Sequence, residues 1–209
     1  MSKFTDPRVL RRFVVLMCIA TVVMFTVWAG VRMYQEEAKN PGDFETRQGD
    51  ILLSDGEYEK AIERFNAALA AQPGHRGAWG GRTTALIAQE RYEEAEADLT
   101  GLIAYLEKTL QPDDPTGRGA LSAAYANRGI IKDRQARYEE ALKDYIASAK
   151  TDRDIAEGPG WINRLLYHDR KPSSVIDRAQ YLYEQLQLPE EKRLLRVPER
   201  DAEQRIYKP

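Results

Sequence analysis

Few residues in this sequence of 209 belong to the types that carry out catalysis or bind metals. The only cysteine, Cys18, lies inside a long apolar run, and neither histidine, His75 nor His168, has a ligand-type residue at a familiar metal-site spacing. Residues 77–84 are glycine-rich but lack the lysine and the spacing of a phosphate-binding loop. We therefore expect no enzyme activity, no catalytic residue, no metal and no cofactor.

The charge of the chain excludes one class of partner. Charged residues make up 31% of the sequence, yet the net charge is only -2, so the chain lacks the basic surface that holds nucleic acid by neutralising its phosphates. We expect protein partners, a membrane complex among them, and neither nucleic acid nor a small-molecule substrate.

One segment is suited to a membrane. Residues 13–31 form an uncharged run of 19 residues, which as a helix spans roughly 28 Å and matches the apolar core of a bilayer. Basic residues outnumber acidic ones by four to one in residues 1–12, which by the positive-inside rule places the N-terminus in the cytoplasm. We expect a single-pass transmembrane helix over residues 13–33 in a bacterial inner membrane, with the rest of the chain in the periplasm.

A cleaved signal peptide is the alternative interpretation of this segment. Val27 and Ala29, before Gly30, satisfy the small-residue rule for cleavage. Against it, the apolar run is longer than that of an ordinary signal peptide, and the bulky Trp28 interrupts the site.

The remainder of the chain contains an internal repeat. A tyrosine, two charged residues and an alanine recur at residues 58–61, 92–95 and 138–141. The first two alanines are 34 residues apart, which is the length of a tetratricopeptide unit, and the next two are 46 apart, which indicates an insertion of 12 residues. Over about residues 42–153 the chain resembles the tetratricopeptide repeat family.

This resemblance implies an all-α fold in which each repeat is a pair of antiparallel helices stacked into a solenoid. We expect a linker over residues 34–41, repeats over 42–75, 76–109 and 122–155, and an insertion loop over 110–121, before which the second helix of repeat two is extended. Residues 156–188 would form a degenerate fourth repeat or cap, with helices over 161–167 and 174–188. Residues 189–209 would form an extended, solvated tail, with docking on a partner or in the protein's own groove as the alternative.

Two ion pairs are expected inside the repeats. Arg82 and Arg128 occupy equivalent positions, and an aspartate, Asp98 or Asp144, follows each of them by 16 residues. An arginine that faces the partner helix of its hairpin needs a counter-charge, because a buried unpaired charge costs several kcal/mol. We therefore predict that Arg82 pairs with Asp98 and that Arg128 pairs with Asp144.

The resemblance also implies a protein-binding groove lined by the first helix of each repeat. On this sequence the lining residues would be Thr46, Asp50, Leu53, Gly80, Thr84, Ile87, Ala126, Asn127, Ile130 and Asp133. The chaperone-binding members of the family hold a terminal carboxylate with a clamp of Lys, Asn and Arg residues. The corresponding positions here are Thr46, Asp50, Gly81, Ala123 and Asn127, so we do not expect that mode of binding.

The leading functional hypothesis is a membrane-anchored scaffold or assembly factor that binds proteins. The layout resembles that of membrane-anchored repeat proteins that serve in the maturation of larger complexes, which is an analogy of architecture. A permanent accessory subunit of a membrane complex and a periplasmic chaperone for exported proteins are the alternatives.

Overall fold

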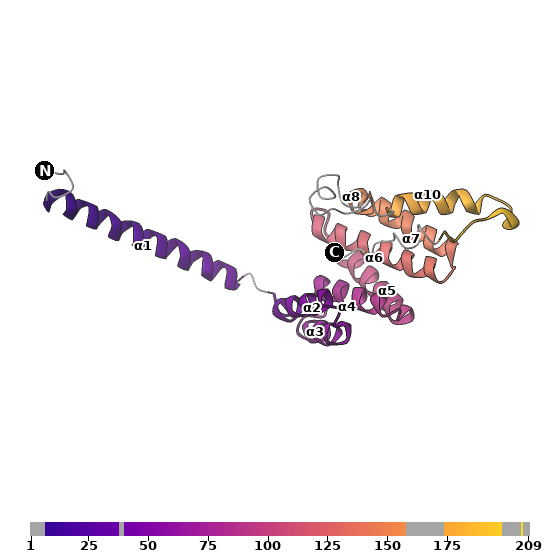
Figure 1. Ribbon diagram of the computed structural model, residues 1–209, viewed down its shortest axis with the longest axis horizontal. Coiled ribbons are helices and arrows are strands. Elements are labelled where there is room, and N and C mark those ends of the chain that lie inside the picture. Colours follow the sequence, from indigo (N-terminus) through magenta and orange to yellow (C-terminus); the bar gives the residue numbers. More distant parts are fainter. Residues whose placement is uncertain (1–6, 38–39, 158–173, 198–205, 207–209) are drawn as a thin grey trace. The chain divides into compact units, whose positions relative to one another are not determined.

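The computed structural model describes residues 7–37, 40–157, 174–197 and 206, and Figure 1 shows that every regular element among them is a helix. The chain divides into two compact units, residues 1–40 and 41–209, which we describe separately. The all-α class predicted from the sequence is confirmed for these residues.

The first unit contains a single long helix, α1 (Pro7–Glu37). Four consecutive residues, Val22 to Phe25, are each more than half exposed, and because successive residues lie 100° apart, they cover most of the helix circumference. The hydroxyls of Thr21 and Thr26 donate to backbone carbonyls one turn earlier, both at 2.8 Å, so these polar groups are satisfied within the helix. Residues 7–32 are long and apolar enough to cross a membrane.

The second unit is built from three helical hairpins. The first helices of the hairpins are α2 (Asp43–Ser54), α4 (Arg76–Ala88) and α6 (Pro115–Arg134), and the second helices are α3 (Tyr58–Ala71), α5 (Tyr92–Thr109) and α7 (Tyr138–Thr151). Consecutive helices along the chain lie side by side, as expected for a solenoid (Figure 1).

The turn inside each hairpin repeats the same backbone geometry. Gly56, Glu90 and Ala136 occupy equivalent positions and all have positive φ, at 77°, 59° and 61°. The amide of the residue after each one donates to the carbonyl five residues earlier, at 2.8, 3.0 and 2.8 Å, which is the Schellman pattern that ends a helix. Two of the three turns therefore hold a non-glycine residue in the left-handed region.

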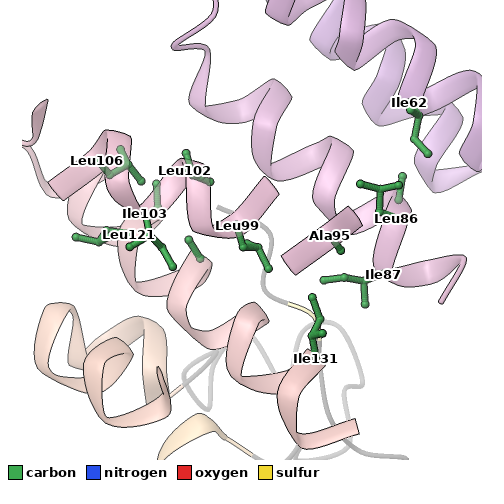
Figure 2. Packing of buried hydrophobic residues seen from close by; sticks show 13 residues of the cluster. Ile62, Leu86, Ile87, Ala95, Leu99, Leu102, Ile103, Leu106, Leu121 and Ile131 are labelled. Atoms are coloured by element: carbon green, nitrogen blue, oxygen red, sulfur yellow. The ribbon is translucent and has the colours of Figure 1, made fainter. Parts of the chain in front are cut away.

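The largest hydrophobic cluster links all three hairpins. Figure 2 shows Ile62 of α3, Leu86 and Ile87 of α4, Leu99 and Leu102 of α5 and Ile131 of α6 converging on one interior. Apart from Ile62, these side chains are at most 4% exposed. Burial of this kind stabilises a fold by about 1.5–3 kcal/mol for each large aliphatic side chain.

The structure corrects the predicted insertion loop over residues 110–121. Helix α5 is extended as expected, with 18 residues against 14 in α3 and α7. Helix α6, however, begins at Pro115, so residues 115–121 are helical and the connection is only residues 110–114. The side chain of Asp114 accepts a hydrogen bond from the amide of Gly117 at 2.7 Å, and proline is well suited to the first turn of a helix.

Beyond α7 the described chain continues with α8 (Arg153–Glu157), α10 (Val175–Leu186) and the short 3-10 helix η2 (Glu190–Lys192). Helix α10 lies within the predicted helix over residues 174–188. It begins with a capping box, in which Ser174 and Asp177 each accept a hydrogen bond from the other's amide. The predicted helix over residues 161–167 and His168 lie outside the described residues.

Candidate protein-binding site

Close contacts between helices position the first helices of the hairpins. A Cβ atom added to Gly49 of α2 would lie 2.6 Å from the ring of Phe65, and one added to Gly81 of α4 would lie 2.4 Å from the same ring. Phe65 of α3 is therefore held between α2 and α4. At the third hairpin Gly129 of α6 makes the equivalent approach to Tyr145 of α7, at 2.6 Å.

Both predicted ion pairs are present in the structure. Arg82 donates from Nε and Nη2 to the two carboxylate oxygens of Asp98, at 2.7 and 2.8 Å. Arg128 donates in the same way to Asp144, at 2.8 and 2.7 Å, and this hydrogen-bonded carboxylate raises the pKa of Arg128 above its usual value.

Each of these arginines also reaches the preceding hairpin. Arg82 donates to Asn66 of α3 at 2.8 Å, and Arg128 donates to Thr100 of α5 at 3.3 Å. Asn66 and Thr100 are 34 residues apart and so occupy equivalent positions. In the second and third hairpins one arginine thus links its own hairpin to the one before.

Most of the predicted groove residues are not free to contact a partner. Seven of the ten are buried, namely Thr46, Gly80, Ile87, Ala126, Asn127, Ile130 and Asp133. Asp50, Leu53 and Thr84 are half-buried. The expectation of a groove open along all three hairpins is therefore wrong at the third hairpin, where all four predicted residues are buried.

The C-terminal helices explain this burial. Ala126 and Ile130 of α6 belong to a hydrophobic cluster that also contains Ala156 of α8 and Val175 and Leu182 of α10. The repeat pattern identifies the inner face of a helix, but it carries no information about a later, non-repeating segment that covers that face.

A buried ion pair attaches α10 to this face. Arg178 of α10 donates from Nε and Nη2 to the carboxylate of Asp133, at 2.7 and 2.8 Å, and both side chains are 3% exposed. The hydroxyl of Tyr145 donates to the same carboxylate at 3.1 Å, and Arg178 donates to the carbonyl of Leu195 at 3.0 Å. Asp133, predicted as a groove residue, instead fastens the C-terminal segment.

The described tail residues also contact the protein itself. Leu195 packs against the cluster of α6, α7 and α10, Ile206 packs against the main cluster of Figure 2, and Arg196 donates to the carbonyl of Arg134 at 2.6 Å. These described residues are therefore not part of a solvated tail, and they contact the protein's own repeats.

The accessible part of the predicted groove therefore lies on the first two hairpins. It comprises Asp50 and Leu53 of α2 and Thr84 of α4, which we call the open groove surface. An aspartate, a leucine and a threonine can supply one charge, one apolar contact and one hydroxyl to a bound segment. Among the described residues, no group of three His, Cys, Asp or Glu side chains could hold a metal ion.

Sequence reasoning missed Arg178 because no fixed spacing relates it to Asp133, 45 residues earlier. The available signal was an arginine on an amphipathic helix that has no acidic residue three or four positions away on the same face. Lys132 was missed as well, although it joins the predicted pair by approaching Asp144 at 2.8 Å.

Comparison with known proteins agrees with the helical hairpins. Residues 52–108 match the tetratricopeptide repeat family. Over 97 residues, or 46% of the chain, the sequence is 33% identical to an Hsp70-Hsp90 organizing protein of Triticum aestivum, and the matched part covers only 16% of that protein. With the repeated hairpins, the glycine contacts and the equivalent arginine pairs, these matches identify the chain as a tetratricopeptide repeat protein.

Proposed function

We propose that this protein is a membrane-anchored scaffold or assembly factor, which uses the open groove surface to bind a segment of a protein partner. The observation that carries this proposal is the unequal accessibility of the groove. The third hairpin is closed by α10, whereas Asp50, Leu53 and Thr84 on the first two hairpins remain accessible.

The apolar surface of α1 supports the anchor. An isolated helix with apolar side chains on all sides is stable in a bilayer and prone to aggregate in water. The basic residues at its start favour insertion with the N-terminus in the cytoplasm, which in a bacterium leaves the repeats in the periplasm.

The chemistry of the open groove surface favours a short extended or helical segment. A groove of this kind recognises shape and hydrogen bonds more than charge. The partners of the wheat relative are not expected for this chain. Thr46, Gly81 and Ala123 occupy positions at which the family's carboxylate clamp has Lys or Asn residues.

A pull-down in mild detergent tests the proposal. The bait is the full chain, compared with Thr84→Arg, which adds a bulky charge to the open groove surface. The matched control is Thr116→Arg, at an exposed position in the first turn of α6. We expect Thr84→Arg to lose the partner and Thr116→Arg to keep it; equal recovery by both variants would remove the groove assignment.

The recovery of the partner separates the possible roles. Sub-stoichiometric recovery with immature forms of a complex supports an assembly factor, and constant stoichiometry with a mature complex supports an accessory subunit. Suppression of client aggregation by the protein supports a chaperone. Protease treatment of spheroplasts tests the topology, and protection of the repeats would contradict a periplasmic location.

A further inference from the structure

The outer face of α2 carries exposed apolar residues that are unusual for the end of a solenoid. Phe44 is 59% exposed and Ile51 is 63% exposed. They are seven residues apart, which is two helical turns, so they lie on the same face. The terminal repeat of a solenoid normally presents a polar outer face to water.

The repeat register shows what this face is suited to contact. The residues equivalent to Phe44 are Ala78 and Ala124, and those equivalent to Ile51 are Ala85 and Ile131. All four equivalents are at most 2% exposed. Ala78 clusters with Phe65 and Ala68 of α3, and Ala124 and Ile131 cluster with residues of α5.

In the second and third hairpins, therefore, this face of the first helix is covered by the second helix of the preceding hairpin. The face of α2 has the same register and leaves its apolar residues exposed. It is thus a helix-stacking face, and a suitable occupant is another helix that crosses it.

The charges around Ile51 indicate which helix this is. Arg47 and Asp55 are both exposed and lie four residues before and four residues after Ile51, about 6 Å along the helix on either side. If two copies of α2 cross in antiparallel fashion at Ile51, a two-fold axis brings Arg47 of each copy opposite Asp55 of the other. The pattern is self-complementary, as an isologous interface requires.

We propose that the C-terminal half of the outer face of α2, formed by Arg47, Ile51 and the C-cap residue Asp55, is a homodimer interface whose occupant is the same segment of a second copy of this chain. Two apolar residues and two ion pairs bury far less than the roughly 800 Å² per partner of a stable interface. The association is therefore weak in dilute solution. It rests on the proposed membrane anchor, which holds the copies in one plane at high effective concentration.

Disulfide cross-linking of the full chain in its membrane tests the interface. In a Cys18→Ala background, Ile51→Cys places a thiol on the expected two-fold axis, and Ile146→Cys places one on α7, where Ile146 is 40% exposed. Mild oxidation should give dimers with Ile51→Cys at least ten times faster than with Ile146→Cys. Equal rates, or a product that contains a different protein, would overturn the proposal.

Charge reversal in the Ile51→Cys protein supplies a second readout. Arg47→Glu alone and Asp55→Arg alone should each lower the dimer yield at least fivefold, because each places like charges opposite one another. The double variant restores unlike pairs and should recover the yield to within twofold of the parent. Failure of this rescue would contradict the two-fold geometry.

Two further measurements keep this result separate from the proposed function. Membrane fractionation of the same variants reports on anchoring, and the partner pull-down reports on the open groove surface. A charge-reversal variant that stays in the membrane and keeps its partner but no longer dimerises supports the interface. If Thr84→Arg and Thr116→Arg recover the partner equally while cross-linking through Ile51→Cys persists, the proposed function fails and the interface stands.

Discussion

The pair formed by Arg178 and Asp133 offers the most demanding test of how the C-terminal segment closes the third hairpin. Both side chains are 3% exposed and share two hydrogen bonds of 2.7 and 2.8 Å. Removal of one partner from such a pair leaves a buried charge without compensation, which costs about 3–5 kcal/mol. We expect Asp133→Leu and Arg178→Met each to lower the free energy of unfolding by about that amount.

The double variant distinguishes the cost of a stranded charge from the intrinsic strength of the pair. Replacement of both residues by apolar side chains removes both desolvated charges, and replacement of a buried pair in this way is often neutral or stabilising by about 1–4 kcal/mol. The double variant should therefore be more stable than either single variant. The assay is urea unfolding of the full chain in detergent, followed by circular dichroism.

An exposed pair in the same chain serves as the control. Arg153 and Glu157 of α8 lie one turn apart at 2.6 Å, and their side chains are 77% and 51% exposed. Exposed pairs of this kind contribute little to stability because water and salt screen them, so Glu157→Gln should have little effect. If Asp133→Leu and Arg178→Met also cost less than about 1 kcal/mol, or if their effects simply add in the double variant, α10 is not fastened as we describe.

Three further predictions concern the repeats. Ala136→Gly should stabilise the protein by up to about 1 kcal/mol in the same unfolding assay, because glycine adopts the positive φ of 61° at that turn without strain; a loss of stability would contradict this account. The pKa of Tyr125 is raised to about 12, first by burial and then by its hydrogen bond to Glu107. Because the folded state favours the protonated phenol, Tyr125 stabilises the fold below the usual tyrosine pKa of about 10, and this stabilisation is lost as the pH rises toward 12. An ultraviolet titration of Tyr125→Phe against the parent should show the loss of one such late-titrating phenol, and no difference would refute the assignment. The hydrogen bond from the amide of Gly117, and then the one from Arg76, lower the pKa of Asp114. The ionised Asp114 therefore stabilises the folded state above about pH 4, and this stabilisation is lost as the pH falls below that value. Asp114→Asn should weaken the dependence of the unfolding free energy on acid pH, and an unchanged dependence would count against the helix cap.

The closed third hairpin alters where a partner can bind. A solenoid with three open first helices would offer a long groove, whereas here α10 and the described tail residues occupy the end at α6. In the function that we propose, binding is confined to α2 and α4, next to the face of α2 on which we place the dimer contact. The short open surface suits a short segment better than a long one.

The sequence by itself determined the helical class, the repeat register and the pairs of Arg82 with Asp98 and Arg128 with Asp144. These features are predictable because the same packing requirement recurs in each repeat and therefore leaves the same residue types at a regular spacing along the chain. The apolar run of α1 was equally readable, because its length and composition are sufficient to cross the apolar core of a bilayer.

Only the tertiary structure decided which faces of these helices are accessible. The burial of Ile130 and Asp133 depends on α10, a segment outside the repeat, and the link between Arg178 and Asp133 joins residues 45 positions apart with no recurring spacing. The exposure of Phe44 and Ile51 likewise does not follow from the repeat register, in which the equivalent residues of α4 and α6 are buried. Periodicity identifies the face of a helix that seeks a neighbour, but long-range packing determines which neighbour it finds.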